Sequence, residues 1–244
     1  MDSSPGQQVA QGGGRGERDR DAPDRGKPSG WSVVPIIGNV YLHYVLDQWF
    51  DKVVRPELRA TAELVRYADD FLVLFANEED AKRLAKYLPV RLAKFGLEVA
   101  PEKTRLILFG AKSWRQGKGA AGSFDFLGFS HHLGTTRKGR MNVVRIPAKK
   151  GVHRFLMETK QWLRRNMHMP PREQQRVLSA KLRGFYQYYG LWLCGKRLLA
   201  VCYQVSWYWR RSLGRRSQKG VTWEWTGHRP WFILPTPTVV HPTV

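Results

Sequence analysis

The chain has 244 residues, of which 41 are Lys or Arg and 20 are Asp or Glu, so its formal net charge is +21. This length is enough for one large domain or two small ones with a buried core. The two cysteines, Cys194 and Cys202, exclude a disulfide framework and a four-ligand zinc site. No apolar run approaches the roughly 20 residues that span a bilayer, and no signal peptide is recognisable. We therefore expect a cytoplasmic protein with no membrane partner.

The excess positive charge is confined to the second half of the chain. Residues 1–110 hold 16 basic and 16 acidic side chains, whereas residues 111–244 hold 25 basic and 4 acidic ones. Eight of the ten Trp residues also lie in the second half. A surface that is both basic and aromatic favours a polyanion partner, above all a nucleic acid.

The first 30 residues contain seven Gly and ten charged side chains, and we expect them to be disordered because they can bury little apolar surface. From residue 31 onward apolar residues recur at helical spacing, which predicts a helix over residues 35–52. Pro35 suits a helix start, and Pro56 is expected to lie past its end. Asp47 and Asp51 are one turn apart on this helix and are expected to face solvent.

Residues 64–75 combine two short apolar stretches around a polar tip, which is typical of a β-hairpin. Asn77 suits the cap of a following helix that ends at Gly96, and Pro89 favours a kink inside it. Residues 104–109 and 124–129 are each predicted to be a strand. The sequence therefore predicts an antiparallel sheet with packed helices.

After Pro147 the pattern becomes helical, with apolar stripes over residues 152–163, 177–189 and 198–209. Pro170 and Pro171 separate the first two helices, and residues 190–195 separate the second from the third. The expected fold class is α+β, with a partial antiparallel sheet followed by an all-helical region. His131 and His132 are interpreted as loop residues, since no other metal-ligating side chain is close in sequence.

Asp69 and Asp70 at the hairpin tip allow two interpretations. Asp is a common turn residue, so two adjacent ones can be an ordinary turn. Crowded carboxylates also repel one another, and a divalent cation relieves that repulsion by binding their oxygens. From these residues alone, a turn and a metal site both remain open.

Six segments, in this order, resemble the bacterial group II intron reverse transcriptase/maturase family. They are Pro-Ile-Ile-Gly-Asn-Val-Tyr-Leu-His-Tyr-Val-Leu-Asp at 35–47, Arg-Tyr-Ala-Asp-Asp-Phe at 66–71, Gly-Leu-Glu-Val-Ala-Pro-Glu-Lys-Thr at 96–104, Phe-Asp-Phe-Leu-Gly-Phe at 124–129, Lys-Leu-Arg-Gly-Phe-Tyr-Gln-Tyr-Tyr-Gly at 181–190 and Trp-Arg-Arg-Ser-Leu at 209–213. The resemblance covers about residues 26–243. It implies a partial palm (31–135) and a helical thumb/maturase domain that binds RNA (136–226). Composition adds a disordered N-terminus (1–30) and a Pro-rich tail (227–244).

The resemblance also implies roles for residues around the tip. In such enzymes a catalytic aspartate at the hairpin tip helps to hold two Mg²⁺ ions for RNA-directed DNA synthesis. Asp69 matches that position, and Asp70 matches its auxiliary partner. Tyr67 and Ala68 would lie beside the primer terminus, and Lys103 near the incoming phosphates, although a solvated Lys103 in a turn is equally expected. Phe126 and Gly128 match a strand pair that grips the primer, but the Phe residues of that segment are as naturally core residues.

Two departures from the family pattern stand out. Nothing matches the first catalytic motif or the fingers, and Gly26–Trp31 replaces a Gly-Thr-Pro-Gln-Gly-Gly segment, with Ser29 in place of its Gln. We therefore expect a truncated enzyme with an incomplete two-metal site, unable to polymerise alone, with an N-terminal reverse transcriptase fragment as the candidate complement. The alternatives are a non-catalytic RNA-binding splicing cofactor and an unstable gene relic.

Basic residues of the second half are the expected contacts to structured intron RNA and to the RNA/DNA template–primer. For any one pair of neighbouring basic residues, a solvated helix face is the simpler interpretation. However, 25 basic residues against 4 acidic ones are more than solvation of helix faces requires. The candidates are Arg137, Lys138, Arg140, Lys149, Lys150, Arg164, Arg165, Arg210, Arg211, Arg215 and Arg216. Some of Tyr186, Tyr188, Tyr189, Trp207 and Trp209 are expected to stack on unpaired bases and others to be buried.

Overall fold

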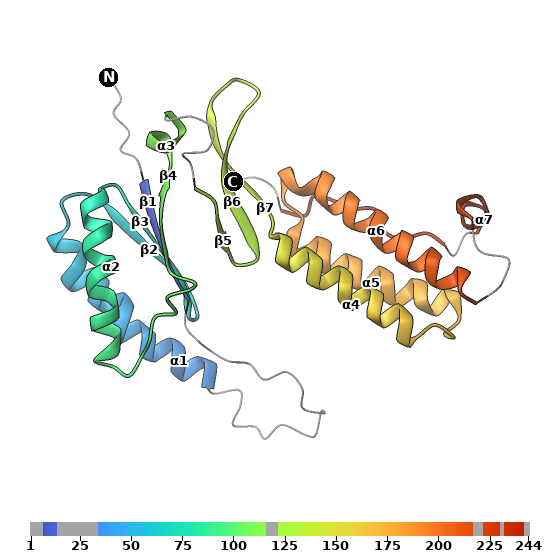
Figure 1. Cartoon of the computed structure of the whole chain (residues 1–244), viewed down its shortest axis with the longest axis horizontal. Coiled ribbons are helices and arrows are strands. Elements are labelled where there is room, and N and C mark those ends of the chain that lie inside the picture. Colours follow the sequence, from blue (N-terminus) through green and yellow to red (C-terminus); the bar gives the residue numbers. More distant parts are fainter. Residues whose placement is uncertain (1–6, 14–33, 116–121, 217–221, 230–231, 242–244) are drawn as a thin grey trace. The chain divides into compact units, whose positions relative to one another are not determined.

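The computed structural model describes residues 7–13, 34–115, 122–216, 222–229 and 232–241. The chain divides into two units: the first comprises residues 1–127 and 132–143, and the second comprises residues 128–131 and 144–244. Helices and small antiparallel sheets are both present, in agreement with the expected α+β class (Figure 1). No helix within the described ranges has the length and apolar character needed to cross a membrane.

Four antiparallel strands form the main sheet of the first unit. They are β1 (Gln7–Gly13), β2 (Ala62–Tyr67), β3 (Asp70–Phe75) and β4 (Arg105–Phe109), in the order β2-β3-β1-β4. The predicted hairpin is confirmed: β2 pairs with β3, with Ala62 opposite Phe75 and Tyr67 opposite Asp70. The strand predicted over residues 104–109 corresponds to β4.

Strand β1 lies inside the segment that we expected to be disordered. It pairs with β3 from Gln8 opposite Phe75 to Gly13 opposite Asp70, and it pairs with β4 along its other edge. The expectation was therefore wrong for Gln7–Gly13, and the other residues of 1–30 lie outside the described part of the chain. Composition reports on side-chain burial, whereas strand pairing uses backbone groups that any residue except proline provides in full.

One continuous helical segment runs from Val34 to Glu57. It begins as α1 (Val34–Leu42), continues through π-helical turns at His43–Asp47 and Phe50–Val54, and ends in a 3₁₀ turn at Arg55–Glu57. The predicted helix is confirmed but is longer than expected. Pro56 does not end it, because it occupies the first turn of the 3₁₀ helix, where its missing N–H costs little.

The second helix of this unit, α2 (Glu78–Ala93), begins at the predicted cap. The side chain of Asn77 accepts a hydrogen bond of 2.8 Å from the backbone N–H of Glu79, and Pro89 lies inside the helix without ending it. Figure 1 shows α2 beside the main sheet, and Val45, Leu46 and Phe50 of the helical segment that continues α1 are buried. The core on this side of the sheet contains Val45, Phe50, Phe71, Val73, Phe75, Leu84 and Leu88.

The opposite face of β3 packs on a smaller core. Because side chains of a strand alternate between faces, Leu72 points away from Phe71 and Val73, and it clusters with Phe109 and Phe124. Phe124 belongs to β5 (Phe124–Phe126), which forms a three-stranded sheet with β6 (Phe129–Thr135) and β7 (Met141–Pro147). The short helix α3 (Ala111–Arg115) follows β4.

The structure corrects two predictions about this smaller sheet. Residues 124–129 form no single strand, because Leu127 and Gly128 adopt φ values of 49° and 77° and separate β5 from β6. A two-residue turn of this kind suits the twist of the strands that it joins. His131 and His132 lie within β6 and not in a loop.

The second unit is mainly helical, as predicted. Its helices are α4 (Lys149–Arg165), α5 (Pro171–Tyr189), α6 (Gly195–Gly214) and the short α7 (Trp223–Gly227), with a 3₁₀ turn at Trp192–Cys194 before α6. Leu163, Leu178, Leu182, Leu198, Val205 and Trp209 are buried in its core. The predicted apolar stripes therefore identify the faces on which these helices pack.

The end of the described chain packs on the second unit. The ring of Phe232 stacks on Trp209 with centroids 4.5 Å apart, and Leu234 is buried. The backbone N–H groups of Val240 and His241 both donate to the carbonyl oxygen of Gly190, over 2.9 and 3.1 Å. Residues 232–241 of the Pro-rich tail are thus held by aromatic packing and backbone hydrogen bonds, without forming a helix or a strand.

Candidate functional site

The candidate catalytic residues lie on the tight turn between β2 and β3. The turn consists of Ala68 and Asp69, with Tyr67 and Asp70 paired on either side of it. Ala68 has a φ of 54°, which is uncommon for a residue with a side chain. The side chains of Asp69 and Asp70 are both exposed, so they project at one end of the sheet.

Arg66 holds this turn against the first helical segment. Its Nε donates to Oδ1 of Asp47 over 2.8 Å, and its Nη2 donates to Oδ2 over 2.7 Å. Its Nη1 donates to the backbone oxygen of Ala68 over 2.9 Å and to Oδ1 of Asn39 over 3.0 Å. The side chains of Arg66 and Asp47 are only 13% and 24% exposed, and this pairing raises the pKa of Arg66. One guanidinium thus connects the turn to the helix.

Sequence reasoning misplaced Asp47. It was expected to face solvent, but it is half-buried and paired with Arg66, whereas Asp51 is exposed and lies 3.3 Å from Arg55. The pairing joins residues 19 positions apart. Apolar periodicity identifies the buried stripe of a helix, but it does not identify the polar contacts at the edge of that stripe. The only sign of the Asp47–Arg66 pair in the sequence is the position of Arg66 next to the tip motif.

The electrostatic environment of Asp70 differs from that of an ordinary surface carboxylate. Partial desolvation raises the pKa of Asp70, and the neighbouring charge of Asp69 raises it further. The positive charge of Lys103 acts in the opposite direction, which places Lys103 within electrostatic reach of the tip. The structure therefore brings together three of the predicted residues, with two like charges whose repulsion a cation would relieve.

The donor chemistry of the tip suits a hard divalent cation in part. Carboxylate oxygens are the ligands that Mg²⁺ prefers, and Mg²⁺ in such sites is commonly bound by one or two protein carboxylates together with substrate phosphates. Within the described ranges, however, no cluster of three or more His, Cys, Asp or Glu side chains is arranged to hold a metal ion. Asp69 and Asp70 thus fit as part of a metal-ligand set.

The remaining residues predicted near the primer have diverse surroundings. Tyr67 is 67% exposed beside the tip, whereas Ala68 is half-buried. Phe126 packs against the small core that contains Leu72. Gly128 has a positive φ, and a Cβ placed there would lie 3.0 Å from the Tyr189 hydroxyl oxygen, so its structural role is a close approach in the second unit.

Most of the predicted RNA-contacting residues are exposed. Arg137, Lys138 and Arg140 lie between β6 and β7, Lys149 and Lys150 in the first turn of α4, and Arg164 and Arg165 in its last turn. Arg211 is exposed on α6, and Arg215 and Arg216 follow that helix. Arg210 is half-buried, and Arg216 uses Nη2 to donate to the carbonyl oxygen of Met169 over 2.8 Å.

The aromatic residues divide between core and surface. Tyr186, Tyr189 and Trp209 are buried, and Trp209 donates from its indole nitrogen to Oε1 of the buried Gln174 over 2.9 Å. Tyr188 is exposed and Trp207 is half-buried. Of the five rings considered from the sequence, these two are placed to meet a ligand.

A hollow of about 400 Å³ between α4 and α6 brings several of these groups together. Its lining includes the predicted cations Arg164, Arg211 and Arg215, and also Trp207. Sequence reasoning missed two further members, Lys160 and Tyr208. Both lie one helical turn from another lining residue, Lys160 before Arg164 and Tyr208 before Ser212, so a helical-wheel comparison of the two helices would have indicated them.

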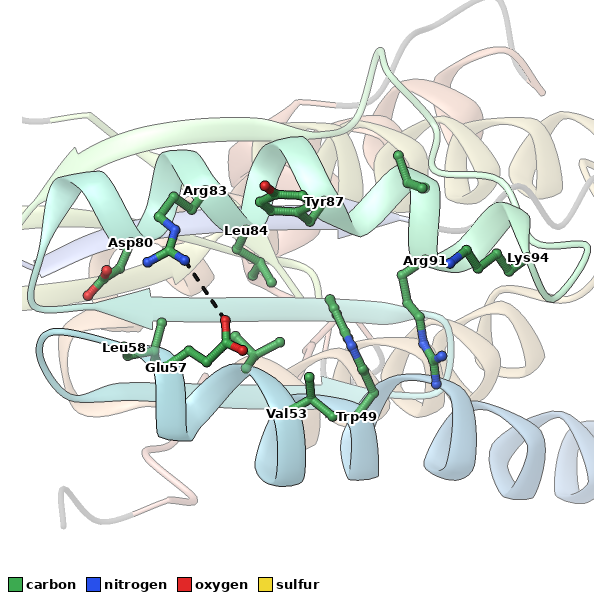
Figure 2. A pocket seen from close by; sticks show the side chains of 12 residues that line it. Trp49, Val53, Glu57, Leu58, Asp80, Arg83, Leu84, Tyr87, Arg91 and Lys94 are labelled. Atoms are coloured by element: carbon green, nitrogen blue, oxygen red, sulfur yellow. Dashed lines mark ion pairs between the residues drawn. The ribbon is translucent and has the colours of Figure 1, made fainter.

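A second hollow, of about 340 Å³, lies in the first unit between α2 and the helical segment that precedes β2 (Figure 2). Trp49 and Leu84 line it, and Arg91 lies over the Trp49 ring at 5.6 Å from its centroid. Arg83 and Glu57 approach to 3.9 Å across it, as the dashed line in Figure 2 shows. Because its walls carry charges of both signs, this hollow is a poor match for a polyanion.

A comparison with known protein families covers the part of the chain that contains the tip. Residues 13–131, just under half of the chain, match the model of the family described as reverse transcriptase (RNA-dependent DNA polymerase). The matched range contains the β2–β3 hairpin, Lys103 and Phe126, and it supports a reverse transcriptase lineage for this part of the chain. A domain of this kind binds a nucleic-acid template. No curated protein matched the chain.

Proposed function

We propose that the chain acts as a group II intron reverse transcriptase/maturase, whose second unit binds structured intron RNA and the RNA/DNA template–primer and assists splicing. The observation that carries this proposal is the turn with Asp69 and Asp70, which Arg66 fastens to the preceding helical segment. The turn lies in the range that matches the reverse transcriptase family. The order of the other motifs, up to residues 209–213, supports the finer assignment to group II introns.

The proposed chemistry is nucleotidyl transfer. Asp69 and Asp70 would hold Mg²⁺, which would supply Lewis-acid chemistry for activating the primer 3′-hydroxyl and for stabilising the charge on the leaving pyrophosphate. Asp69 is the proposed metal ligand and Asp70 its auxiliary partner. Lys103, whose positive charge partly opposes the rise in the pKa of Asp70, would offset the negative charge of the incoming phosphates. Tyr67 and Ala68 would support the primer end beside the turn.

We infer that this chain extends a primer only together with a segment that supplies the fingers and a further carboxylate. Two-metal transfer needs more ligands than one adjacent pair provides. In the described residues, no third acidic side chain joins Asp69 and Asp70 in a metal-binding cluster. An N-terminal reverse transcriptase fragment is the proposed partner.

RNA binding by the second unit follows from its charge. Eight of the predicted contact residues lie in the second unit, and all of them except Arg210 are exposed. A surface with this many like charges repels itself unless a polyanion neutralises it. Contacts of this kind release counterions from the RNA, so affinity falls steeply as salt concentration rises. The same surface would serve splicing assistance and template binding.

A non-catalytic RNA-binding splicing cofactor is the second candidate function. It is favoured by one observation, the lack of a three-ligand metal cluster among the described residues. In this alternative, Asp69 and Asp70 form only the turn, and all function lies in the second unit. The two candidates share the RNA surface and differ in whether Asp69 matters.

A primer-extension assay with Mg²⁺ separates them. The full chain is tested alone and mixed with a reverse transcriptase fragment that carries fingers and the first catalytic carboxylate. We expect no synthesis by the chain alone, and synthesis in the mixture that Asp69→Asn abolishes and Glu98→Gln leaves intact. A mixture that assists intron splicing but never extends a primer would favour the cofactor. Asp69-dependent synthesis by the chain alone would overturn the need for a partner.

A further inference from the structure

The hollow between α4 and α6 combines cations and aromatic rings on two facing helices. Lys160 and Arg164 lie one turn apart on α4, and Arg211 and Arg215 lie one turn apart at the end of α6. Trp207 lies one turn before Arg211. Because residues four apart share one face of a helix, each helix contributes a continuous stripe to the hollow.

The four cations have no negative partner within the part of the chain that the structure describes. Among the described residues, none of them takes part in an ion pair, and no carboxylate lines the hollow. Four like charges around one hollow repel each other, and an anion that enters would be attracted by all of them. Phosphate groups are the anions that arginine and lysine bind best in this way.

Two of the cations are already held in position by aromatic rings. The guanidinium carbon of Arg211 lies 5.2 Å from the centre of the Trp207 ring, and the ammonium nitrogen of Lys160 lies 5.7 Å from the centre of the Tyr208 ring. The two rings contact each other edge to face, with centroids 5.5 Å apart. These contacts lower the entropy that the cations lose when an anion binds.

The base of the hollow is firm and its size is limited. Leu163 and Ser212 form part of it and are buried, and the Ser212 hydroxyl donates to the carbonyl oxygen of Leu163 over 3.5 Å. Its volume of about 400 Å³ lies near the lower end of the range for small-ligand pockets. A space of this kind suits one nucleotide, whereas a duplex presents bases whose faces are covered by their neighbours.

We propose that this hollow binds one unpaired nucleotide of the RNA, with its base against the Trp207–Tyr208 pair and its flanking phosphates against Lys160, Arg164, Arg211 and Arg215. This rests on the proposed function, because RNA binding by the second unit is its premise. It adds a preference for RNA with a bulged or looped-out base over fully paired RNA of equal charge.

Two RNA hairpins test this proposal with the full chain, one fully paired and one identical except for a single bulged adenosine. Stacking of one base on aromatic rings makes binding of the bulged RNA about tenfold tighter for the unaltered chain. Trp207→Leu is expected to remove this preference, and Trp207→Phe, which keeps a flat ring, to retain most of it. Lys149→Gln, a cation outside the hollow, should weaken binding of both RNAs equally. Thermal unfolding verifies that each variant is folded.

The outcomes distinguish the pocket from RNA binding itself. If both hairpins bind equally well to the unaltered chain, or if Trp207→Leu weakens both by the same factor, the nucleotide pocket is wrong while RNA binding stands. If neither hairpin binds, the proposed function fails. If AMP at micromolar concentration abolishes the preference, the hollow is a site for free nucleotides, which also overturns the proposal.

Discussion

Arg66 and Asp47 form a two-bond ion pair that joins the Asp69–Asp70 turn to the helical segment ahead of it. The bonds measure 2.8 and 2.7 Å, and the remaining nitrogen of the guanidinium bonds to Asn39 and to the backbone of Ala68. Bidentate pairs of this kind fix geometry as well as supply energy. The position of the proposed metal ligands therefore depends on a residue that does not itself bind metal or nucleotide.

The first prediction concerns this pair. Arg66→Gln leaves the half-buried carboxylate of Asp47 without its charged partner, and we expect a loss of about 2 kcal/mol in the free energy of unfolding. Asp47→Asn should cost a similar amount, and the double variant less than the sum. Thermal or urea unfolding measures all three.

A matched control exists on the same helical segment. Asp51 pairs with Arg55 at 3.3 Å, but both side chains are largely exposed, so Asp51→Asn should change stability by less than about 0.5 kcal/mol. Equal losses for Asp47→Asn and Asp51→Asn, or strict additivity of the Arg66 and Asp47 variants, would contradict the role given to the pair.

The second prediction concerns Asp70. Its raised pKa means that the folded state disfavours the ionised carboxylate relative to the unfolded state. Asp70→Asn should therefore raise the free energy of unfolding at pH 7, by less than about 1 kcal/mol because the side chain is partly solvated. The gain should shrink as pH falls through the folded-state pKa and should vanish below about 3.9, where both states are protonated.

Unfolding of the two proteins between pH 3 and pH 7 tests this. The exposed Glu98, changed to Gln, serves as the control and should show no comparable gain. If Asp70→Asn lowers the free energy of unfolding at neutral pH, repulsion at the tip is the wrong explanation. The same holds if the gain in the free energy of unfolding grows as the pH is lowered.

The features that could be predicted from the sequence are those set by residues within one helix, strand or turn. The apolar periodicity identified the helical segment from residue 35 and the stripes of α4, α5 and α6, since periodicity reports directly which face is buried. The cap at Asn77 and the hairpin tip at Asp69 were likewise readable, because both are defined by a few neighbouring residues.

Sequence reasoning failed where a feature depends on partners distant in sequence. Strand β1 gains its hydrogen bonds from β3 and β4, more than 50 residues away, and its own composition gave no sign of them. The Leu127–Gly128 turn was missed because a leucine at positive φ carries no turn signature. The hollow between α4 and α6 joins Lys160 to Tyr208, and only the packing of the two helices reveals it.

The third prediction concerns a buried polar link in the second unit. Gln174 is fully buried, donates from Nε2 to the carbonyl oxygen of Asn166 over 2.7 Å, and accepts from the Trp209 indole over 2.9 Å. Trp209→Phe leaves the Gln174 oxygen buried without this donor and opens a small cavity, so we expect a loss of about 2 to 3 kcal/mol. Trp192→Phe, at a ring that is 67% exposed, should change stability by less than about 0.5 kcal/mol. Similar thermal unfolding midpoints for the two variants would disprove the link.

The last prediction concerns a conflict between stability and binding at the start of α4. Lys149 and Lys150 occupy the first turn of this helix, which holds no acidic residue, although the helix dipole favours negative charge there. Lys150→Glu should therefore stabilise the free protein by about 0.5 kcal/mol and at the same time weaken its binding to structured RNA. If Lys150 neutralises one phosphate, its replacement should also reduce the slope of log affinity against log salt by nearly one.

Glu173→Lys in the first turn of α5 is the reciprocal control, with an expected loss of stability. If Lys150→Glu leaves both the affinity and the salt slope unchanged, the start of α4 lies outside the RNA-binding surface.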